Sequence, residues 1–198
     1  MNILLVGGTH GDEPSGVKLV HHFEAYPHKC VDVLMANPKA VAKKVRFVES
    51  DLNRCFGAEN PQTIEERRAE EITPLIQAAD LVMDIHNAWS PGMTCVITVC
   101  APNAWHIHLA RYFGIEKILH IGGPGKSLIG RKPRRGAALE IGREKTDTFS
   151  TEFLATRVVE MCEDGLRRKL RTLVRVYRRI GSTMSRENLA ARDVDIKT

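Results

Sequence analysis

The sequence predicts an α/β fold in which a mostly parallel central sheet has helices on both faces. Short apolar segments alternate with stretches of helical periodicity along most of the chain. The apolar segments are nearly continuous in hydrophobicity, which is typical of parallel strands buried on both faces. With 198 residues, 43% hydrophobic and 27% charged, the chain is long enough for one domain with a substantial core.

Six apolar segments are predicted as buried strands. The first runs directly into a glycine-rich turn at Gly7 and Gly8. The second ends at Asn37, because the residue before a proline avoids the helical region. A later basic, β-branched segment, residues 170–182, predicts one more strand. The six buried strands are expected at residues 2–8, 30–38, 80–86, 93–102, 115–121 and 137–142.

Four segments have the spacing of helices. In the first, Val17, Val20 and Phe23 fall on one side, and Pro14 lies near the start, where a proline fits the first turn. The second is a charged amphipathic stretch, and the last ends before Gly165, a common helix stop. The helices are expected at residues 13–25, 63–79, 105–113 and 150–164.

Composition argues against several classes of protein. The net charge of +5 arises from basic clusters at residues 126–135 and 167–179, but neither cluster has zinc-finger spacing or an aromatic platform, so we expect no nucleic-acid partner. The five cysteines are scattered without a CxxC pair, which argues against a disulfide scaffold. No segment has the length of a membrane span, and the apolar N-terminus is too short for a signal peptide. A cytoplasmic protein outside the membrane is expected.

Three polar side chains follow predicted strands in a pattern that could bind a metal. GGTHGDE places His10 and Glu13 three residues apart at a strand-to-helix turn, and DIHN places His86 at the end of a later strand. Two histidines and one glutamate with an open fourth position form a known catalytic zinc set. From spacing alone, the turn could also cradle a phosphate and the histidines could be ordinary core residues.

Two further carboxylates stand out on these strands. Asp84 shares a strand face with His86 and could orient that histidine from behind. Glu140 interrupts the apolar segment AALEIG, where burial would raise its pKa toward the range of a general base. A salt bridge from Glu140 to Arg131, Arg134 or Arg135 is an equal alternative.

The segment DLNR presents polar side chains in a predicted loop. Asn53 and Arg54 lie in it and Arg46 lies just upstream. Arginine recognises carboxylates with two hydrogen bonds, so the loop could bind an anionic substrate. Taken by itself, the motif could equally be a solvated polar loop.

The motifs GGTHGDE, NPKAVAKKVRFVESDLNRCF, DIHN and LEIG, in this order, closely resemble the aspartoacylase and succinylglutamate desuccinylase family, aspartoacylase most of all. The resemblance spans residues 3 to about 165. It implies a zinc-carboxypeptidase-like three-layer fold and a zinc-dependent amidohydrolase that releases a carboxylic acid from a small anionic N-acyl amino acid, usually an acidic one. Peptide hydrolysis by a zinc carboxypeptidase and a metal-binding protein without catalysis are the alternatives.

Carried over residue by residue, the resemblance implies one zinc ion per chain and a role for each polar position. Glu140 matches the general base, and Arg46 matches an arginine that polarises the scissile carbonyl. Asp12 stands where an asparagine is common, at a position that is not a ligand. The implied zinc ligands are His10, Glu13 and His86, and the implied substrate contacts are Asn53, Arg54 and Arg131, with Arg134 and Arg135 as competitors for the last position.

The resemblance also predicts the domain organisation. Family members carry a second, β-rich domain that caps the site and supplies a tyrosine. We expect residues 1–165 to form the catalytic domain and residues 166–198 to be a basic stub of that second domain, with Tyr177 in its opening strand rather than at the capping position. The substrate pocket would then be more open, or closed by a neighbouring subunit of a homo-oligomer.

Overall fold

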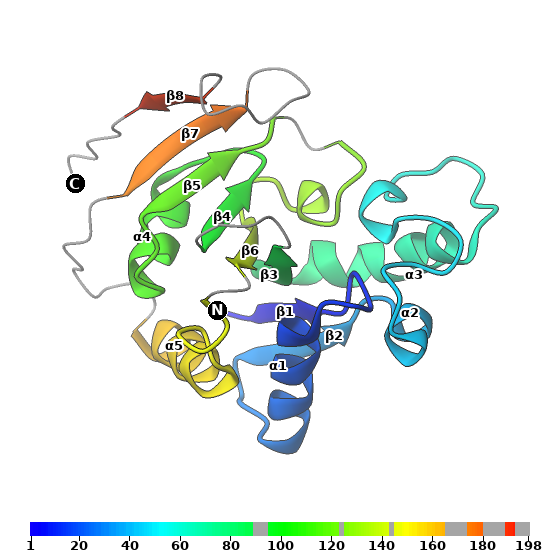
Figure 1. Cartoon of the computed structure of the whole chain (residues 1–198), viewed down its shortest axis with the longest axis horizontal. Helices are drawn as coiled ribbons and strands as arrows, with labels where there is room; N and C mark the ends of the chain where they lie inside the picture. The colour runs from blue at the N-terminus through cyan, green and yellow to red at the C-terminus, as the bar shows by residue number, and fades with distance from the viewer. Residues whose placement is uncertain (89–94, 123–124, 143–144, 165–173, 180–188, 193–198) are drawn as a thin grey trace.

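A computed structural model describes residues 1–88, 95–122, 125–142, 145–164, 174–179 and 189–192. Within these residues one eight-stranded sheet forms the centre of the molecule, in the order β2-β1-β3-β6-β4-β5-β7-β8 (Figure 1). The strands are β1 (Ile3–Gly7), β2 (Val31–Met35), β3 (Leu81–Ala88), β4 (Val96–Val99), β5 (Lys117–His120), β6 (Gly136–Gly142), β7 (Arg175–Arg179) and β8 (Leu189–Arg192). The helices are α1 (Pro14–Ala25), α2 (Pro38–Lys43), α3 (Ile64–Ala78), α4 (Ala104–Tyr112) and α5 (Thr151–Asp164), with short 3-10 turns η1 (Leu52–Arg54) and η2 (Ile129–Arg131).

The sheet is mostly parallel, as the sequence predicts. Strands β2, β1, β3 and β6 run in one direction, and β4, β5 and β7 run together in the other. The antiparallel step between β6 and β4 pairs Glu140 with Val96, so β4 begins where β6 ends. The carboxyl ends of β1, β3 and β6 therefore meet at one edge, which is where ligands commonly bind in α/β sheets.

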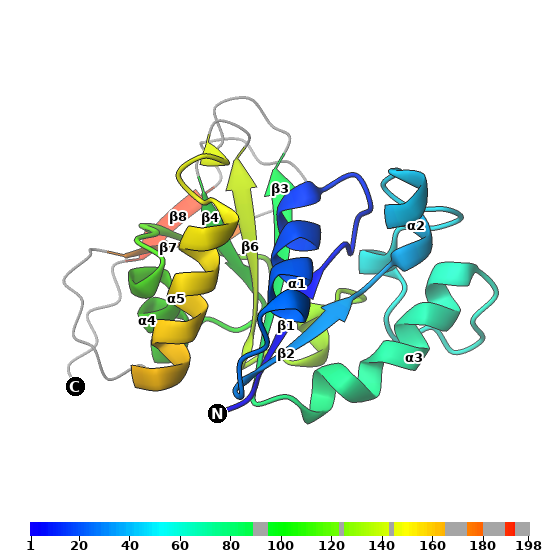
Figure 2. The same cartoon turned by 90° about the horizontal axis from the view of Figure 1, so that it is seen from below.

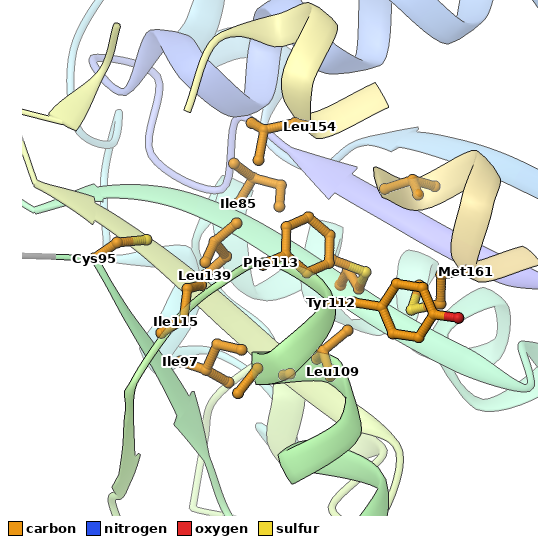
Figure 3. Packing of buried hydrophobic residues seen from close by; sticks show 14 of the residues in the cluster. Ile85, Cys95, Ile97, Leu109, Tyr112, Phe113, Ile115, Leu139, Leu154 and Met161 are labelled. Atoms are coloured by element: carbon orange, nitrogen blue, oxygen red, sulfur yellow. The ribbon is translucent and has the colours of Figure 1, made fainter. Parts of the chain in front are cut away.

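Helices cover both faces of the sheet, which confirms the three-layer prediction. Helices α1 and α5 lie side by side on one face (Figure 2). Alternation along β1 sends Ile3 and Leu5 into the core beneath these helices and sends Leu4 and Val6 to the other side. There they pack with buried residues of α3 such as Ile72. Figure 3 shows the first of these two cores, with Tyr112 at the end of α4 close to Met161 of α5.

The chain between β2 and η1 differs from the prediction. The expected strand at 30–38 is too long, because β2 ends at Met35 and Asn37 begins α2 instead. The Asn37 side chain accepts a hydrogen bond from the N–H of Ala40, and Pro38 occupies the first helical position. An Asn-Pro pair can end a strand or cap a helix, and here it does both. The 3-10 turns η1 and η2 and strand β8 were also not predicted.

The predicted strand at 170–182 is present as β7, and its partners lie in the central sheet. β7 pairs in parallel with β5 and in antiparallel with β8. Residues 170–173 and 180–182, like Gly165, lie outside the described residues. The assignment of 166–198 to a second domain stays a prediction. Within the described chain, every helix is too short or too polar to cross a membrane.

Candidate active site

The turn from β1 into α1 positions the first two candidate ligands. Gly8 has φ +67°, the left-handed conformation that favours glycine, and a Cβ on Gly11 would lie 2.1 Å from the backbone of Ala40. These glycines let the turn double back tightly against α2. Glu13 occupies the N-cap position of α1 but makes no capping hydrogen bond with its side chain. Its carboxylate is therefore available to the site.

The three predicted ligands converge in a buried cluster. Glu13 Oε1 lies 2.8 Å from His10 Nδ1, and Glu13 Oε2 lies 2.8 Å from His86 Nδ1. His86 reaches the cluster from β3, which is the neighbour of β1 in the sheet. All three residues are buried, and one ligand atom of each lies within 4.8 Å of the other two. Residues separated by up to 76 positions thus present nitrogen and oxygen atoms to one point.

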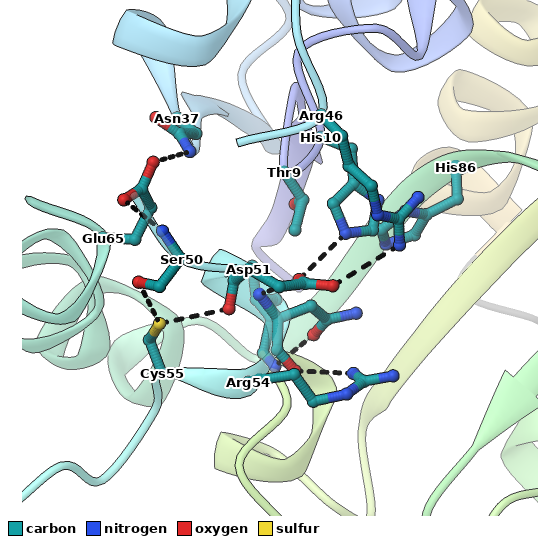
Figure 4. Close-up of polar contacts among 12 residues, drawn as sticks. Thr9, His10, Asn37, Arg46, Ser50, Asp51, Arg54, Cys55, Glu65 and His86 are labelled. Atoms are coloured by element: carbon teal, nitrogen blue, oxygen red, sulfur yellow. Dashed lines mark hydrogen bonds and ion pairs between the residues drawn. The ribbon is translucent and has the colours of Figure 1, made fainter. Parts of the chain in front are cut away.

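The outer nitrogens of both histidines are held by carboxylates. His86 Nε2 lies 2.7 Å from Asp84 Oδ2, and His10 Nε2 lies 3.1 Å from Asp51 Oδ1 (Figure 4). Asp84 is itself oriented, because the hydroxyl of Thr9 donates to its other oxygen over 2.8 Å. A carboxylate that accepts the Nε2 proton leaves Nδ1 of the same ring as the nitrogen that can bind a metal ion, once the Nδ1 proton donated to Glu13 is lost.

Sequence reasoning anticipated Asp84 but missed Asp51 and Thr9. Both lie inside motifs that it singled out, DLNR and GGTHGDE. For Asp51, the available signal was the presence of a carboxylate within a motif already tied to the site. Thr9 gave no comparable signal, since a threonine beside a glycine-rich turn is common.

The electrostatics of the cluster suit a divalent cation. Burial disfavours charge on Glu13, but hydrogen bonds from His10 and His86 outweigh it and lower the pKa of Glu13 to about 2. The carboxylates of Glu13, Asp51 and Asp84 thus surround two imidazoles. A set of two imidazole nitrogens and one carboxylate oxygen, with no thiolate, fits zinc in a catalytic rather than a structural site.

Glu140 lies next to the cluster on β6. It pairs in register with His86, so both side chains project from the same face of the sheet. Burial raises the pKa of Glu140, the His86 imidazole opposes that rise, and the carboxylates of Glu13 and Asp84 add to it. No salt bridge to Glu140 occurs among the described residues. Its carboxylate is therefore suited to taking up a proton.

Arg46 faces the same cluster from the loop after α2. Its guanidinium lies 3.5 Å from Glu13 Oε1 and 3.5 Å from Asp51 Oδ2 (Figure 4). The side chain is 43% exposed, so it borders the cluster and remains open to solvent on its other side.

The remaining substrate candidates lie on two turns that contact each other. Asn53 Oδ1 accepts from the N–H of Leu128 over 2.9 Å, which ties η1 to the segment that leads into η2. Arg54 is exposed, and its guanidinium donates to the carbonyl of Asn53. Arg131 donates to the carbonyl of Gly125, while its Nε–H is buried and has no partner among the described residues. The side-chain oxygen of Asn53 therefore links the two turns that carry Arg54 and Arg131.

Arg134 and Arg135, the competitors of Arg131, lie at the other end of β6 from Glu140. Both precede Gly136, the first residue of the strand, and both are exposed. The Arg135 carbonyl accepts from Val82 near the start of β3. A seven-residue strand spans roughly 20 Å, so these two arginines begin far from the cluster.

Comparison with known proteins decides the family. The succinylglutamate desuccinylase/aspartoacylase catalytic domain matches residues 1–178. This chain belongs to that family. The desuccinylase/aspartoacylase family thus accounts for the order of motifs along the chain and for the fold.

Relatives of the desuccinylase/aspartoacylase domain include enzymes with different named substrates. The chain is 29% identical over 180 residues to an N-acyl-aromatic-L-amino acid amidohydrolase of Xenopus laevis, covering 77% of this chain and 59% of that protein. It is 39% identical over 114 residues to the aspartoacylase of Rattus norvegicus, covering 48% of this chain and 36% of that protein. The chain therefore spans less than two thirds of these curated relatives.

Solved structures of the family share the fold. The succinylglutamate desuccinylase of Chromobacterium violaceum superimposes with a TM-score of 0.76 at 19% identity, covering 91% of this chain and 67% of that one. Murine aminoacylase 3 gives a TM-score of 0.74 at 21% identity, covering 95% and 74%. The zinc-carboxypeptidase-like architecture is thereby confirmed.

Proposed function

We propose that this chain is a zinc-dependent amidohydrolase that cleaves N-acyl amino acids into a carboxylic acid and an amino acid. The observation that carries the proposal is the buried convergence of His10, Glu13 and His86, with both histidines oriented by carboxylates behind them. These three side chains would hold a zinc ion, which when bound would act as a Lewis acid and lower the pKa of a water molecule from 15.7 toward about 7.

Glu140 is the proton carrier in this proposal. Its half-buried carboxylate has a raised pKa and projects from the same face of the sheet as His86, so it can accept a proton from the attacking water. The same carboxyl group can then return the proton to the departing amine. A carboxylate that stayed strongly acidic would hold such a proton too weakly.

Arg46 stabilises the negative charge that develops on the scissile carbonyl oxygen. Its guanidinium borders the ligand cluster, and a fixed cation aimed at that oxygen lowers the barrier to attack. Arg54 and Arg131 lie on the two turns joined by Asn53, and their guanidinium groups can bind the carboxylates of the substrate. Two arginines favour an acidic amino acid as the substrate.

The test is a panel of N-acyl amino acids offered to the parent protein and to Glu140→Gln. The panel contains N-acetylaspartate, N-acetylglutamate, N-succinylglutamate and N-acetylphenylalanine, and release of the free amino acid is measured. We expect turnover of the acidic compounds, its loss in a chelator and its return with zinc. Glu140→Gln should retain zinc and lose at least about a hundredfold in kcat, since general-base catalysis contributes 10²–10⁴.

The matched control is Glu116→Gln, an exposed glutamate beside β5, which should behave as the parent. Turnover that resists chelation would refute the zinc mechanism. Faster cleavage of N-acetylphenylalanine than of the acidic compounds would refute the proposed substrate class. Bound zinc without turnover of any compound would instead indicate a metal-binding protein without catalysis.

A further inference from the structure

A buried carboxylate outside the proposed reaction holds the loop that carries Arg46. Glu65, the second residue of α3, has 0% exposed surface. Its carboxylate accepts four hydrogen bonds of 2.7–3.2 Å, from the side-chain amide of Asn37 and from the consecutive backbone N–H groups of Val48, Glu49 and Ser50. Figure 4 shows Glu65 between Asn37 and Ser50.

The three anchored amides lie between two residues that contact the ligand cluster. Arg46 precedes them and lies 3.5 Å from Glu13, while Asp51 follows them and lies 3.1 Å from His10. We call residues 44–51 the bridging loop, because it connects α2 to η1 and lies between α3 and the cluster. Fixing residues 48–50 therefore constrains the Arg46 guanidinium on one side and the Asp51 carboxylate on the other.

Hydrogen bonds to fixed partners define the path of the bridging loop. The loop contains no helix or strand, so its own backbone does not pair regularly. The Arg46 carbonyl accepts from the N–H of Gly11, and the Ser50 hydroxyl lies 2.7 Å from that of Thr63. Loss of the Glu65 carboxylate would leave three adjacent, partly buried N–H groups without their acceptor, which would free this part of the loop to move.

We propose that Glu65 is a positioning residue that fixes the bridging loop so that Arg46 and Asp51 face the ligand cluster. The proposal rests on the proposed function for the role of Arg46. A displacement of about 1 Å in a group that stabilises the transition state can reduce the rate about a hundredfold. Because Arg46 acts on the reacting carbonyl, we expect loss of the anchor to lower kcat more than it raises KM.

The chain contains a matched control in the next residue. Glu66 also lies in the first turn of α3, where it completes a capping box by accepting from the N–H groups of Thr63 and Gln62. Replacing Glu66 with glutamine weakens the start of the same helix without removing an acceptor from the bridging loop. If Glu65 merely stabilises α3, the two variants should behave alike.

The experiment compares Glu65→Gln with Glu66→Gln in the zinc-loaded protein. Glutamine has one acceptor oxygen, and its NH₂ group opposes the backbone N–H groups, so at least part of the anchor is lost. For Glu65→Gln we expect amide exchange at 48–50 to accelerate at least tenfold and kcat to fall at least tenfold. Both quantities should stay within twofold of the parent in Glu66→Gln.

Three results would overturn the proposal. These are unchanged exchange in Glu65→Gln, faster exchange with unchanged kcat, and equal effects in both variants. If Glu65→Gln does not fold, Asn37→Ser takes its place, because serine can still cap α2 while the amide donor to Glu65 is lost. That variant should show the same direction of change at about threefold, and no change would contradict the proposal.

The outcome separates this proposal from the proposed function. If the parent cleaves no N-acyl amino acid, the proposed function fails, and amide exchange at 48–50 alone decides whether Glu65 fixes the loop. If the parent is active and Glu65→Gln matches it, the proposed function stands and the role of Glu65 is refuted.

Discussion

At the scale of single residues, Glu13 joins the two histidines of the candidate metal site. Each of its two oxygens contacts a different histidine, and Glu13 Oε2 also accepts from the backbone N–H of Asn87 over 3.1 Å. This backbone contact fixes the carboxylate against β3. A ligand held in this way keeps its geometry when a cation binds, because few groups need to reorganise.

The two arginine-bearing turns give a prediction about substrate affinity. Arg54→Gln and Arg131→Gln should each raise KM about ten- to hundredfold, since hydrogen bonds to a charged group contribute about 1.5–3 kcal/mol. Arg134→Gln is the control and should leave KM unchanged, because Arg134 lies at the far end of β6. Steady-state kinetics on the best substrate of the panel decides the matter. An effect of Arg134→Gln as large as that of Arg131→Gln would contradict the assignment.

Whether a site residue could be predicted from the sequence depends on how far it lies from its partner along the chain. The short spacing of His10 and Glu13 within one turn is visible directly, and the end of a strand pointed to His86. The partnerships of Asp51 with His10 and of Thr9 with Asp84 join residues 41 and 75 positions apart, and neither pair leaves a local pattern. Glu65 was invisible for another reason, since an acidic residue in the first turn of a helix is ordinary.

At the scale of elements, buried polar contacts fix the start of α4. His106 has 0% exposed surface, its Nδ1 accepts from the N–H of Asn103, and its Nε2–H donates to the carbonyl of Gly136. The first bond requires the neutral ring, since a protonated Nδ1 would oppose the Asn103 N–H. Burial is the main cause that lowers the pKa of His106 to about 4, from 6.5.

This contact predicts a pH dependence of stability. The unfolded chain takes up a proton at His106 below pH 6.5 and the folded chain does so only near pH 4, so stability falls as the pH drops through that window. The expected loss is about 3 kcal/mol between the two values. Urea unfolding of parent and His106→Asn at several pH values measures it. Equal slopes for both proteins between pH 4 and 6.5 would contradict the assignment.

The sequence predicts that the long helices and most strands exist, but it predicts the residues at which they begin and end less well. Strong periodicity located α1, α3, α4 and α5, and the short apolar segments located seven of the strands. Helix α2 was missed because an Asn-Pro pair can either end a strand or begin a helix, and Asn37 here also caps the helix. The antiparallel direction of β4 has no local signature at all.

At the scale of the whole molecule, two hydrophobic cores sandwich the sheet. Leu19 of α1 and Ile76 of α3 are fully buried on opposite faces, whereas Leu75, the neighbour of Ile76, is 53% exposed. Leu19→Ala and Ile76→Ala should each lower the free energy of unfolding by about 2–5 kcal/mol. Leu75→Ala should change it by less than about 0.5 kcal/mol. Equal effects at Leu75 and Ile76, measured in urea, would contradict the layer assignment.

The layered fold brings its functional groups to one edge of the sheet. The chain after β1 and the ends of β3 and β6 supply the candidate ligands and Glu140, and the chain between α2 and α3 supplies Arg46 and Asp51. Segments close to the start, middle and end of the domain thus build one site. The proposed chemistry needs a metal ion in this cluster, so the metal is the claim on which the rest depends.

Anomalous diffraction at the zinc absorption edge tests that claim most directly. Crystals of the protein as purified should show one anomalous peak per chain, within about 2.0–2.2 Å of the inner nitrogens of His10 and His86 and of a Glu13 oxygen. Absence of a peak there, or zinc bound by other residues instead, would contradict the account.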